Sequence, residues 1–269
     1  MPELTDCSYS RDECIALIRN YYSFLTTMYL PEDAVIHPPV EGWPTISSEN
    51  FRDMKKTPEV ISLLRHLPYI RVPSTNPLEQ AQGAPWCYFA DWQNVGALLE
   101  RNMDGKSLKL VSEGPDICDN VPAHVIGLTD GGRENPIFLL DTELGVIYWP
   151  DCPGEISNNP SYNNIQIFDD PYEWAPDDEA DWRDNASRWT MKGFFEVLKD
   201  QFLNLSFIAT SPTDVIDVYS TPNSKSDGSI ERLQNIYRQH GWPDAENFRK
   251  QECLEALENA MEQQSHMVG

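Results

Sequence analysis

Three titratable residues lie in or next to apolar runs in the middle of the chain, and their side chains could do acid–base chemistry. His124 lies within one run, Asp130 follows that run, and Asp141 ends the next one. An imidazole exchanges a proton near neutral pH, and a neighbouring carboxylate can orient the ring or act as a second acid or base. Asp141 and Glu143 could likewise act as a pair of carboxylates. Turns between strands favour aspartate for structural reasons, however, so we favour a structural role and keep the chemical one as the alternative.

The short motifs that mark catalysis or cofactor binding do not occur in the sequence. It contains no phosphate-binding loop, dinucleotide glycine fingerprint, HExxH or GxSxG. Cys118 precedes His124 by six positions, but a thiol nucleophile needs a base that is close in space. The cysteines form no CxxC, and the acidic stretches lack the glycine of an EF-hand loop. We therefore expect no catalytic residues, no metal and no cofactor.

The chain is strongly acidic, with a formal net charge of −23. Such a surface repels phosphate backbones and anionic lipids, so we expect neither nucleic acid nor a membrane as a partner. The charge could serve solubility alone. Alternatively, an acidic face could receive a basic protein. The densest acidic stretch, Asp169–Asp184, has eight acids against one arginine and includes Trp174 and Trp182.

No apolar run approaches the roughly 20 residues that a membrane span requires. The N-terminal residues show no cationic region followed by an apolar one, so no signal peptide is apparent. In a chain without export, the six scattered cysteines are expected to be reduced. We therefore expect the protein in the cytoplasm or the nucleus.

An antiparallel meander is predicted between Val121 and Trp149. Two apolar runs, Ala123–Leu128 and Ile137–Leu140, flank the loop Thr129–Pro136, and Val146–Trp149 follows a turn. β-Branched and aromatic residues bounded by Gly, Asp and Asn are typical of such strands. The aromatic run Trp86–Trp92 reads as a further buried strand, or as a strand that enters a short helix over Val95–Arg101. Ser107–Ser112 is predicted to be another short strand.

Helices are predicted on both sides of this sheet segment in the sequence. Ser10 caps a helix that runs to Tyr29, and Thr57-Pro58 begins a second one. Apolar residues with helical spacing over Thr190–Leu205 predict a helix that packs on the sheet. Two more helices, Ser229–His240 and Asp244–Gln264, form a C-terminal hairpin. This hairpin could dock on its own domain, which we favour, or offer its apolar stripe to a partner.

Together these elements predict an α+β fold. A mainly antiparallel sheet is covered by helices on one face, with N-terminal helices and a C-terminal helical hairpin. The domain organisation that we expect is a single α+β domain over residues 1–221, with its sheet core at about 86–205, a spacer at 222–228 and the hairpin at 229–269.

The order and residues of these elements resemble the SUKH superfamily, which includes fungal regulators of cell-wall synthesis and bacterial immunity proteins against secreted toxins. The similarity covers roughly Trp86 to Leu205. It lies in the following elements: Val121-Pro122, Gly127, the strand Ile137–Leu140 ending at Asp141, the turn at Gly145, the strand Val146–Trp149 and the helix Thr190–Phe202. The resemblance implies an α+β fold with helices on one face of the sheet, and a non-enzymatic role in binding other proteins.

Two hypotheses about function follow. In the first, the chain is a protein-binding module whose acidic surface and tryptophans, Trp149, Trp174 and Trp182, contact a basic protein. In the second, it is an enzyme with an aromatic-lined pocket and with Asp141, His124 and Asp130 at one end of the sheet. The second requires at least two of those three side chains in one concave pocket, within hydrogen-bonding reach.

Overall fold

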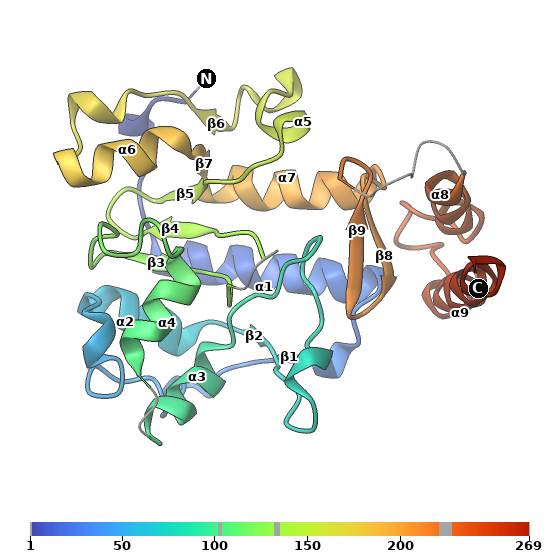
Figure 1. Ribbon diagram of the computed structural model, residues 1–269, viewed down its shortest axis with the longest axis horizontal. Coiled ribbons are helices and arrows are strands. Elements are labelled where there is room, and N and C mark those ends of the chain that lie inside the picture. Colours follow the sequence, from blue (N-terminus) through green and yellow to red (C-terminus); the bar gives the residue numbers. More distant parts are fainter. Residues whose placement is uncertain (1, 102–103, 132–134, 221–227, 269) are drawn as a thin grey trace.

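The computed structural model describes residues 2–101, 104–131, 135–220 and 228–268, and it has the predicted α+β fold (Figure 1). Its central sheet consists of the strands β3 (Val125–Gly127), β4 (Leu139–Asp141), β5 (Val146–Trp149), β7 (Ser187–Thr190) and β6 (Gln166–Ile167), in that spatial order. All neighbouring strands are antiparallel, and the first three form the predicted meander.

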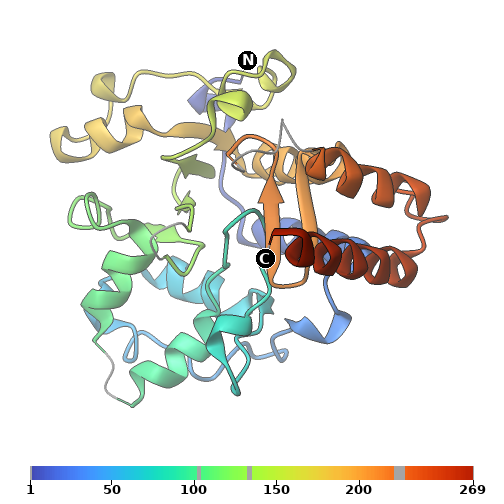
Figure 2. The same ribbon diagram turned by 45° about the vertical axis from the view of Figure 1, so that its right-hand side comes forward.

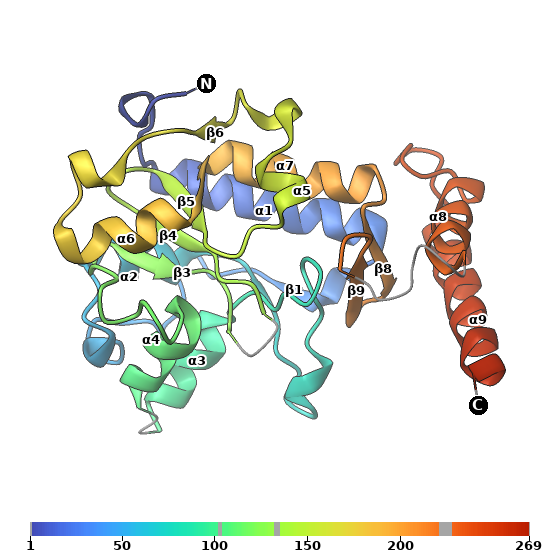
Figure 3. The same cartoon turned by 45° about the horizontal axis from the view of Figure 1, so that its top comes forward.

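One face of the sheet packs against two long helices, α1 (Arg11–Met28) and α7 (Met191–Leu203). The two helices lie side by side (Figures 1 and 3). Leu140 and Ile147, which are partners in the β4–β5 register, belong to this core. The predicted packing of the 190–205 helix on the sheet is therefore seen. Phe194 of α7 places its ring centroid 4.8 Å from that of Phe138 beside the sheet.

The other face of the sheet is covered by α6 (Asp177–Asn185) and by irregular segments. Alternation along the strands turns Leu139, Val146 and Tyr148 to this side, where they form a second, smaller core. Trp182 of α6 joins it, with its ring centroid 5.2 Å from that of Tyr148. The acidic stretch of the sequence thus folds back over the sheet through α6.

Shorter elements close the lower part of the molecule in Figure 1. They comprise the helices α2 (Pro58–His66), α3 (Trp92–Leu99) and α4 (Gly105–Glu113), and the strand pair β1 (Val35–Ile36) and β2 (Tyr69–Ile70). The single-turn helix α5 (Gly154–Ser157) lies elsewhere, between β5 and β6 in the chain. Turns of 3-10 helix occur at Leu4–Asp6, Glu32–Ala34, Arg52–Met54, Pro77–Glu79, Pro160–Tyr162 and Pro171–Glu173.

Side-chain caps fix where several helices begin. The Ser10 hydroxyl accepts the Glu13 amide, and the Thr57 hydroxyl accepts the Val60 amide just before Pro58, as predicted for α1 and α2. Thr190 caps α7 in the same way by accepting the Gly193 amide. Each cap satisfies an amide that has no partner within its helix.

The C-terminal part of the chain adds a two-stranded sheet and two helices. β8 (Phe207–Ser211) pairs with β9 (Asp214–Asp217), and this hairpin lies between the body of the molecule and the helices α8 (Ser229–Gln239) and α9 (Lys250–Val268) (Figures 1 and 2). The Tyr237 hydroxyl donates to the Ala209 carbonyl at 2.7 Å. The helical hairpin therefore packs on its own chain. Of the predicted spacer at 222–228, only Gly228 belongs to the described residues.

Three details differ from the sequence predictions. Ser107–Ser112 is helical, because Asp104 accepts the Lys106 amide and starts α4 ahead of it. Trp86–Trp92 contains no strand beyond two isolated bridges, Cys87 with Ala84 and Phe89 with Thr129. The short helix expected at Val95–Arg101 is present as α3, which Asp91 caps so that it starts earlier, at Trp92. The last helix begins at Lys250 rather than at Asp244, after a series of turns.

No helix among the described residues combines the length and the apolar character that crossing a membrane requires.

Candidate functional site

A buried arginine, Arg183 of α6, is the centre of the polar network between α6 and the sheet. Its side chain is 1 % exposed. Nη1 donates to Asp141 Oδ2 at 3.0 Å and to the Tyr148 hydroxyl at 2.8 Å. Nε and Nη2 both donate to Glu179 Oε2, at 2.9 and 2.7 Å. Two carboxylates therefore face one guanidinium, which is the kind of pairing that a buried charge needs.

Aromatic rings enclose the same guanidinium. Its central carbon lies 4.6 Å from the ring centroid of Trp182, 5.0 Å from that of Tyr148 and 5.2 Å from that of Trp174. A cation over an aromatic face is attracted to it, more strongly where water is excluded. Arg183 thus joins Trp174 and Trp182 to the sheet.

Asp141 ends β4 and is completely buried. Its Oδ1 accepts the backbone amides of Glu143 and Leu144, each at 2.9 Å, so the side chain closes the turn into β5. Burial alone would raise the pKa of Asp141, but His124, Arg183 and the Leu144 amide hold it below its ordinary value. Asp141 therefore has the structural role that we expected for an aspartate in a turn between strands, and it also forms an ion pair with Arg183.

His124 reaches this network from the segment that enters β3. Its Nε2 lies 3.5 Å from Asp141 Oδ2, and its Nδ1 lies 3.6 Å from Glu143 Oε1. The hydrogen bond to Asp141 raises the pKa of His124, and burial opposes it only partly. Both imidazole nitrogens thus face carboxylates, which favours the charged ring.

The structure brings four of the six sequence-selected residues together and separates the other two. His124, Asp141, Trp174 and Trp182 belong to the Arg183 network. Asp130 lies at another part of the molecule, where its amide donates to the Tyr88 carbonyl at 2.9 Å. Its side chain is exposed at one edge, yet the surrounding protein and the Asp91 carboxylate raise the pKa of Asp130 to about 6.

Trp149 and Trp182 are almost fully buried, so neither lies on the open surface where the prediction placed them. Each is only 4 % exposed. Trp149 packs on the opposite side of the sheet from Trp182, with its ring centroid 5.0 Å from that of Phe138. The alternation of β5 explains this position, since Tyr148 and Trp149 must point to opposite faces.

Trp174 does reach solvent, and it has two aromatic neighbours in the sequence that our sequence reasoning missed. Phe168, Tyr172 and Trp174 are 48 %, 62 % and 39 % exposed. Exposed carboxylates surround them in the sequence, namely Asp170, Glu173, Asp177, Asp178, Asp181 and Asp184. We call these nine residues the acidic-aromatic face. The alternation of aromatic and acidic residues over 168–174 was the signal that could have found it.

Local contacts hold the acidic-aromatic face in place. Trp174 Nε1 donates to Asp169 Oδ2 at 2.8 Å, and Asp169 Oδ1 lies 3.0 Å from Arg188 Nε. The Tyr172 hydroxyl donates to Asp181 Oδ1 at 3.3 Å. The side chains of Trp174 and Tyr172 are therefore held by contacts within the chain before any partner arrives, which lowers the entropy cost of binding.

The geometry around His124 and Asp141 does not make an acid–base site of the expected kind. Both carboxylate oxygens of Asp141 are engaged, one by backbone amides and one by Arg183. The sheet face that bears Leu140 and Ile147 is filled by residues of α1 and α7 rather than hollow. Asp130 lies apart from the pair. Within the described ranges, no group of three or more His, Cys, Asp or Glu residues is arranged to hold a metal ion.

A second buried ion pair joins Lys56, two residues before α2, to Glu113 at the end of α4. Lys56 Nζ is 2.5 Å from Glu113 Oε1, and neither side chain is exposed. Lys56 also donates to the Val125 carbonyl at 2.6 Å, next to the sheet. Desolvation raises the pKa of Glu113 to about 7 in spite of the two lysines near it, Lys56 and Lys109. Lys56 and Glu113 therefore connect α4 to β3, which is a structural role.

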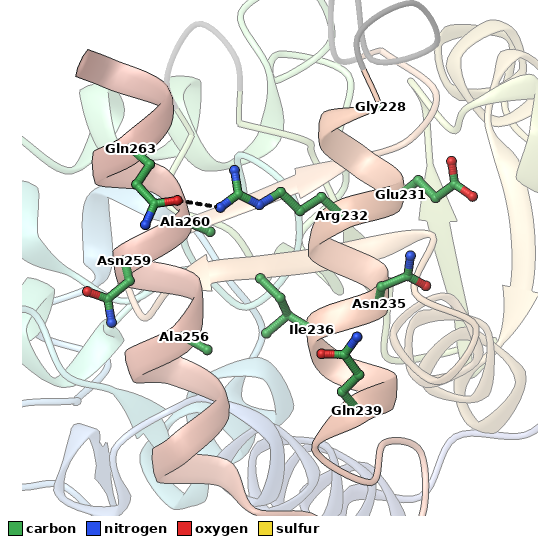
Figure 4. A pocket seen from close by; sticks show the side chains of 10 residues that line it. All are labelled: Gly228, Glu231, Arg232, Asn235, Ile236, Gln239, Ala256, Asn259, Ala260 and Gln263. Carbon is green, nitrogen blue, oxygen red and sulfur yellow. Dashed lines mark hydrogen bonds between the residues drawn. The ribbon is translucent and has the colours of Figure 1, made fainter. Parts of the chain in front are cut away.

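Two hollows adjoin the C-terminal helices. One, of about 660 Å³, lies between α8 and α9, and four of its ten lining residues are amides; Arg232 crosses it to donate to Gln263 Oε1 at 2.7 Å (Figure 4). The other, of about 510 Å³, lies between α9 and the β8–β9 turn, with Glu255 and Glu258 among its lining residues. Neither contains a residue selected from the sequence.

Comparison with protein-family models, with curated proteins and with solved structures gave no match. The function is therefore inferred from the geometry of the chain itself.

Proposed function

We propose that this chain is a non-enzymatic protein-binding module that receives a basic, partly apolar segment of another protein on its acidic-aromatic face. The SUKH-like resemblance of the sequence, which implies protein binding, belongs to the same proposal. So does a place of action in the cytoplasm or nucleus.

The observation that carries the proposal is the composition of the exposed surface over residues 168–184. Three large aromatic side chains are exposed beside six exposed carboxylates, and Arg183, the one cation in this stretch, is buried. Exposed aromatic rings are typical of binding surfaces, and a concentration of one charge selects the opposite charge in a partner. Solubility alone would explain the acids but not the rings.

A defined probe tests the proposal better than an unknown partner. We suggest a synthetic peptide of alternating lysine and leucine, with an alternating glutamate and leucine peptide as the charge control. Binding of the lysine peptide should weaken as salt rises, because the carboxylates are exposed. The backbone NMR signals of residues 168–184 should shift when it binds.

Matched variants separate this face from the general acidity of the chain. Phe168→Ser/Tyr172→Ser and Asp177→Asn/Asp178→Asn should each weaken binding by about tenfold, the loss of roughly 1.4 kcal/mol. Glu255→Gln/Glu258→Gln removes the same charge from α9 and should leave binding unchanged. Equal losses for the two charge variants, or shifts spread over the whole surface, would overturn the proposal.

A further inference from the structure

A second, smaller cavity has a different chemistry from the acidic-aromatic face and shares no residue with it. Its volume is about 280 Å³. This lies at the lower end of the roughly 300–1,000 Å³ that drug-sized ligands occupy, so it suits a single side chain or a small molecule. The lining combines aromatic rings, prolines and carboxylates, and no lining residue is positively charged.

Four aromatic side chains line this cavity: Trp86, Phe138, Trp149 and Phe207. The rings of Phe138 and Trp149 pack edge to face, at 80° and with centroids 5.0 Å apart. Phe138, Trp149 and Phe207 are almost fully buried behind the cavity, so Trp86 supplies most of the ring surface that a ligand can reach. Trp86 is the most exposed of the four and stands in a tight turn, where the Cys87 amide donates to the Ala84 carbonyl at 3.0 Å. Its backbone has a positive φ of 59°, which is uncommon for a bulky residue.

Two carboxylates give the cavity its charge. Asp151 is exposed, whereas Asp217 ends β9 and is buried. Asp217 Oδ1 accepts the amides of Tyr219 and Ser220 at 2.7 and 2.6 Å, and its Oδ2 accepts the Ser220 hydroxyl at 2.8 Å. The position of that negative group is therefore fixed. Aromatic faces and fixed carboxylates together attract a cation.

The cation that fits these walls best carries methyl groups in place of hydrogens. A primary ammonium brings three donors that need acceptors, and the aromatic rings and the prolines Pro85, Pro136 and Pro153 offer their carbon surfaces instead. A quaternary ammonium has no N–H to satisfy, and it is the group that aromatic cages recognise.

One polar group of the wall has no partner. The indole N–H of Trp149 is buried and makes no hydrogen bond within the described structure. Buried donors are nearly always paired, and among the residues that line this cavity Trp149 is the one whose buried side-chain donor has no partner within the described residues. A hydroxyl or carbonyl a few bonds from the cation would be an acceptor for this N–H.

We propose that the cavity between the Ala84–Cys87 turn, Phe138, Trp149 and the Phe207–Asp217 strand pair binds a methylated ammonium group. The group could come from a small molecule such as choline or from a trimethyllysine side chain in a protein. Choline carries its hydroxyl three bonds from the nitrogen, whereas the peptide carbonyl of trimethyllysine is seven bonds away, so only choline places an acceptor close to the cation.

The test uses the full chain, and the indole N–H signals in ¹H–¹⁵N NMR spectra are the readout. Choline and a capped peptide containing trimethyllysine are titrated separately, with 3,3-dimethylbutanol as the neutral molecule of the same shape as choline. At least one cation should shift the Trp86 and Trp149 signals, and the tighter of the two identifies the source. Choline should bind about tenfold more tightly than its neutral analogue, which is the contribution of a partly desolvated cation–π contact.

Variants at the exposed residues keep the test independent of folding. Trp86→Phe should bind nearly as well as the original chain, whereas Trp86→Leu, which keeps the bulk and loses the ring, should bind about tenfold less tightly. Asp151→Asn should weaken binding, and Tyr172→Leu on the acidic-aromatic face should not. The proposal is wrong if neither cation shifts the two indole signals, if the neutral analogue binds as well as choline, or if Trp86→Leu binds as well as Trp86→Phe. Because Tyr172 belongs to the other site, failure here leaves the proposed protein-binding function standing.

Discussion

Arg183 Nη1 and Asp141 Oδ2 lie 3.0 Å apart, in a place where neither side chain reaches solvent, and 42 positions separate the two residues in the sequence. This ion pair joins the helix under the acidic-aromatic face to the turn between β4 and β5. Removing one partner from such a pair leaves the other buried without compensation.

We predict that Arg183→Met destabilises the protein by about 3–5 kcal/mol, because Asp141 would keep its burial and lose the nearer of its two cationic partners. Chemical denaturation followed by circular dichroism measures the change. Arg183→Met/Asp141→Asn should be more stable than Arg183→Met alone, since position 141 then carries no buried charge, while Glu179 loses its cation equally in both variants. If the two variants unfold at the same denaturant concentration, the pair is not coupled in the way the distance implies.

The charge state of His124 should be readable by NMR. Its pKa is raised above 6.5, chiefly by the hydrogen bond to Asp141. A raised pKa means that this contribution to stability is fully present below pH 6.5 and is lost as the pH rises through the folded value. The C–H signals of the His124 ring should therefore titrate above pH 6.5, and Glu143→Gln should lower that midpoint. A midpoint below 6.5 in the original chain would contradict the contacts described.

We predict that Glu113 makes the stability of the protein depend on pH in a different range. Desolvation raises the pKa of its carboxyl from 4.5 to about 7 in the folded chain. The folded state therefore holds this proton more tightly than the unfolded state, and stability falls as the pH rises from 4.5 to 7. Glu113→Gln should flatten the dependence of the unfolding free energy on pH in that window. Parallel curves for the two proteins would show that Lys56 and Lys109 keep Glu113 ionised.

The docking of α9 can be followed through Cys253. This thiol is completely buried, and desolvation raises its pKa to about 12, so thiol reagents should not react with it while α9 is docked. Leu257 is equally buried one turn further on. Leu257→Ala should destabilise by about 2–5 kcal/mol and speed the labelling of Cys253.

Glu258→Ala is the matched control, since Glu258 is exposed on the same helix. It should leave the labelling rate of Cys253 near that of the original chain. Rapid labelling of the original chain would mean that α9 leaves the β8–β9 hairpin readily.

Local signals in the sequence were sufficient for the helix starts and for the meander. Ser10 and Thr57 cap amides within three positions, and the turn closed by Asp141 spans only a few residues, so nearby residues hold the needed information. The prediction of a strand at 107–112 was wrong. Alternating apolar residues suit a strand, but the hydrogen bond that starts the helix is accepted by Asp104, which lies outside that pattern.

The site was harder to predict because its partners are distant in the sequence. The addition of β7 to β5 pairs Trp149 with Ser187, and it carries α6 back over the sheet. Only this pairing brings Arg183 to Asp141 and Tyr148. From the sequence, a lone arginine among eight acids reads as part of a solvated stretch. The tryptophans were similarly ambiguous, since composition does not show that Trp174 is exposed while Trp149 and Trp182 are buried.

The contact between the last helix and the first has a consequence for the order of events during folding. Lys250 Nζ donates to the carbonyls of Thr26 and Leu30, both at 2.7 Å, across 224 and 220 positions. The end of α1 is thus completed by a side chain that is synthesised 220 or more positions later. Contacts with such long sequence separation form late and slow the search for the native state. The end of α1 is therefore finished only after α9 has been made.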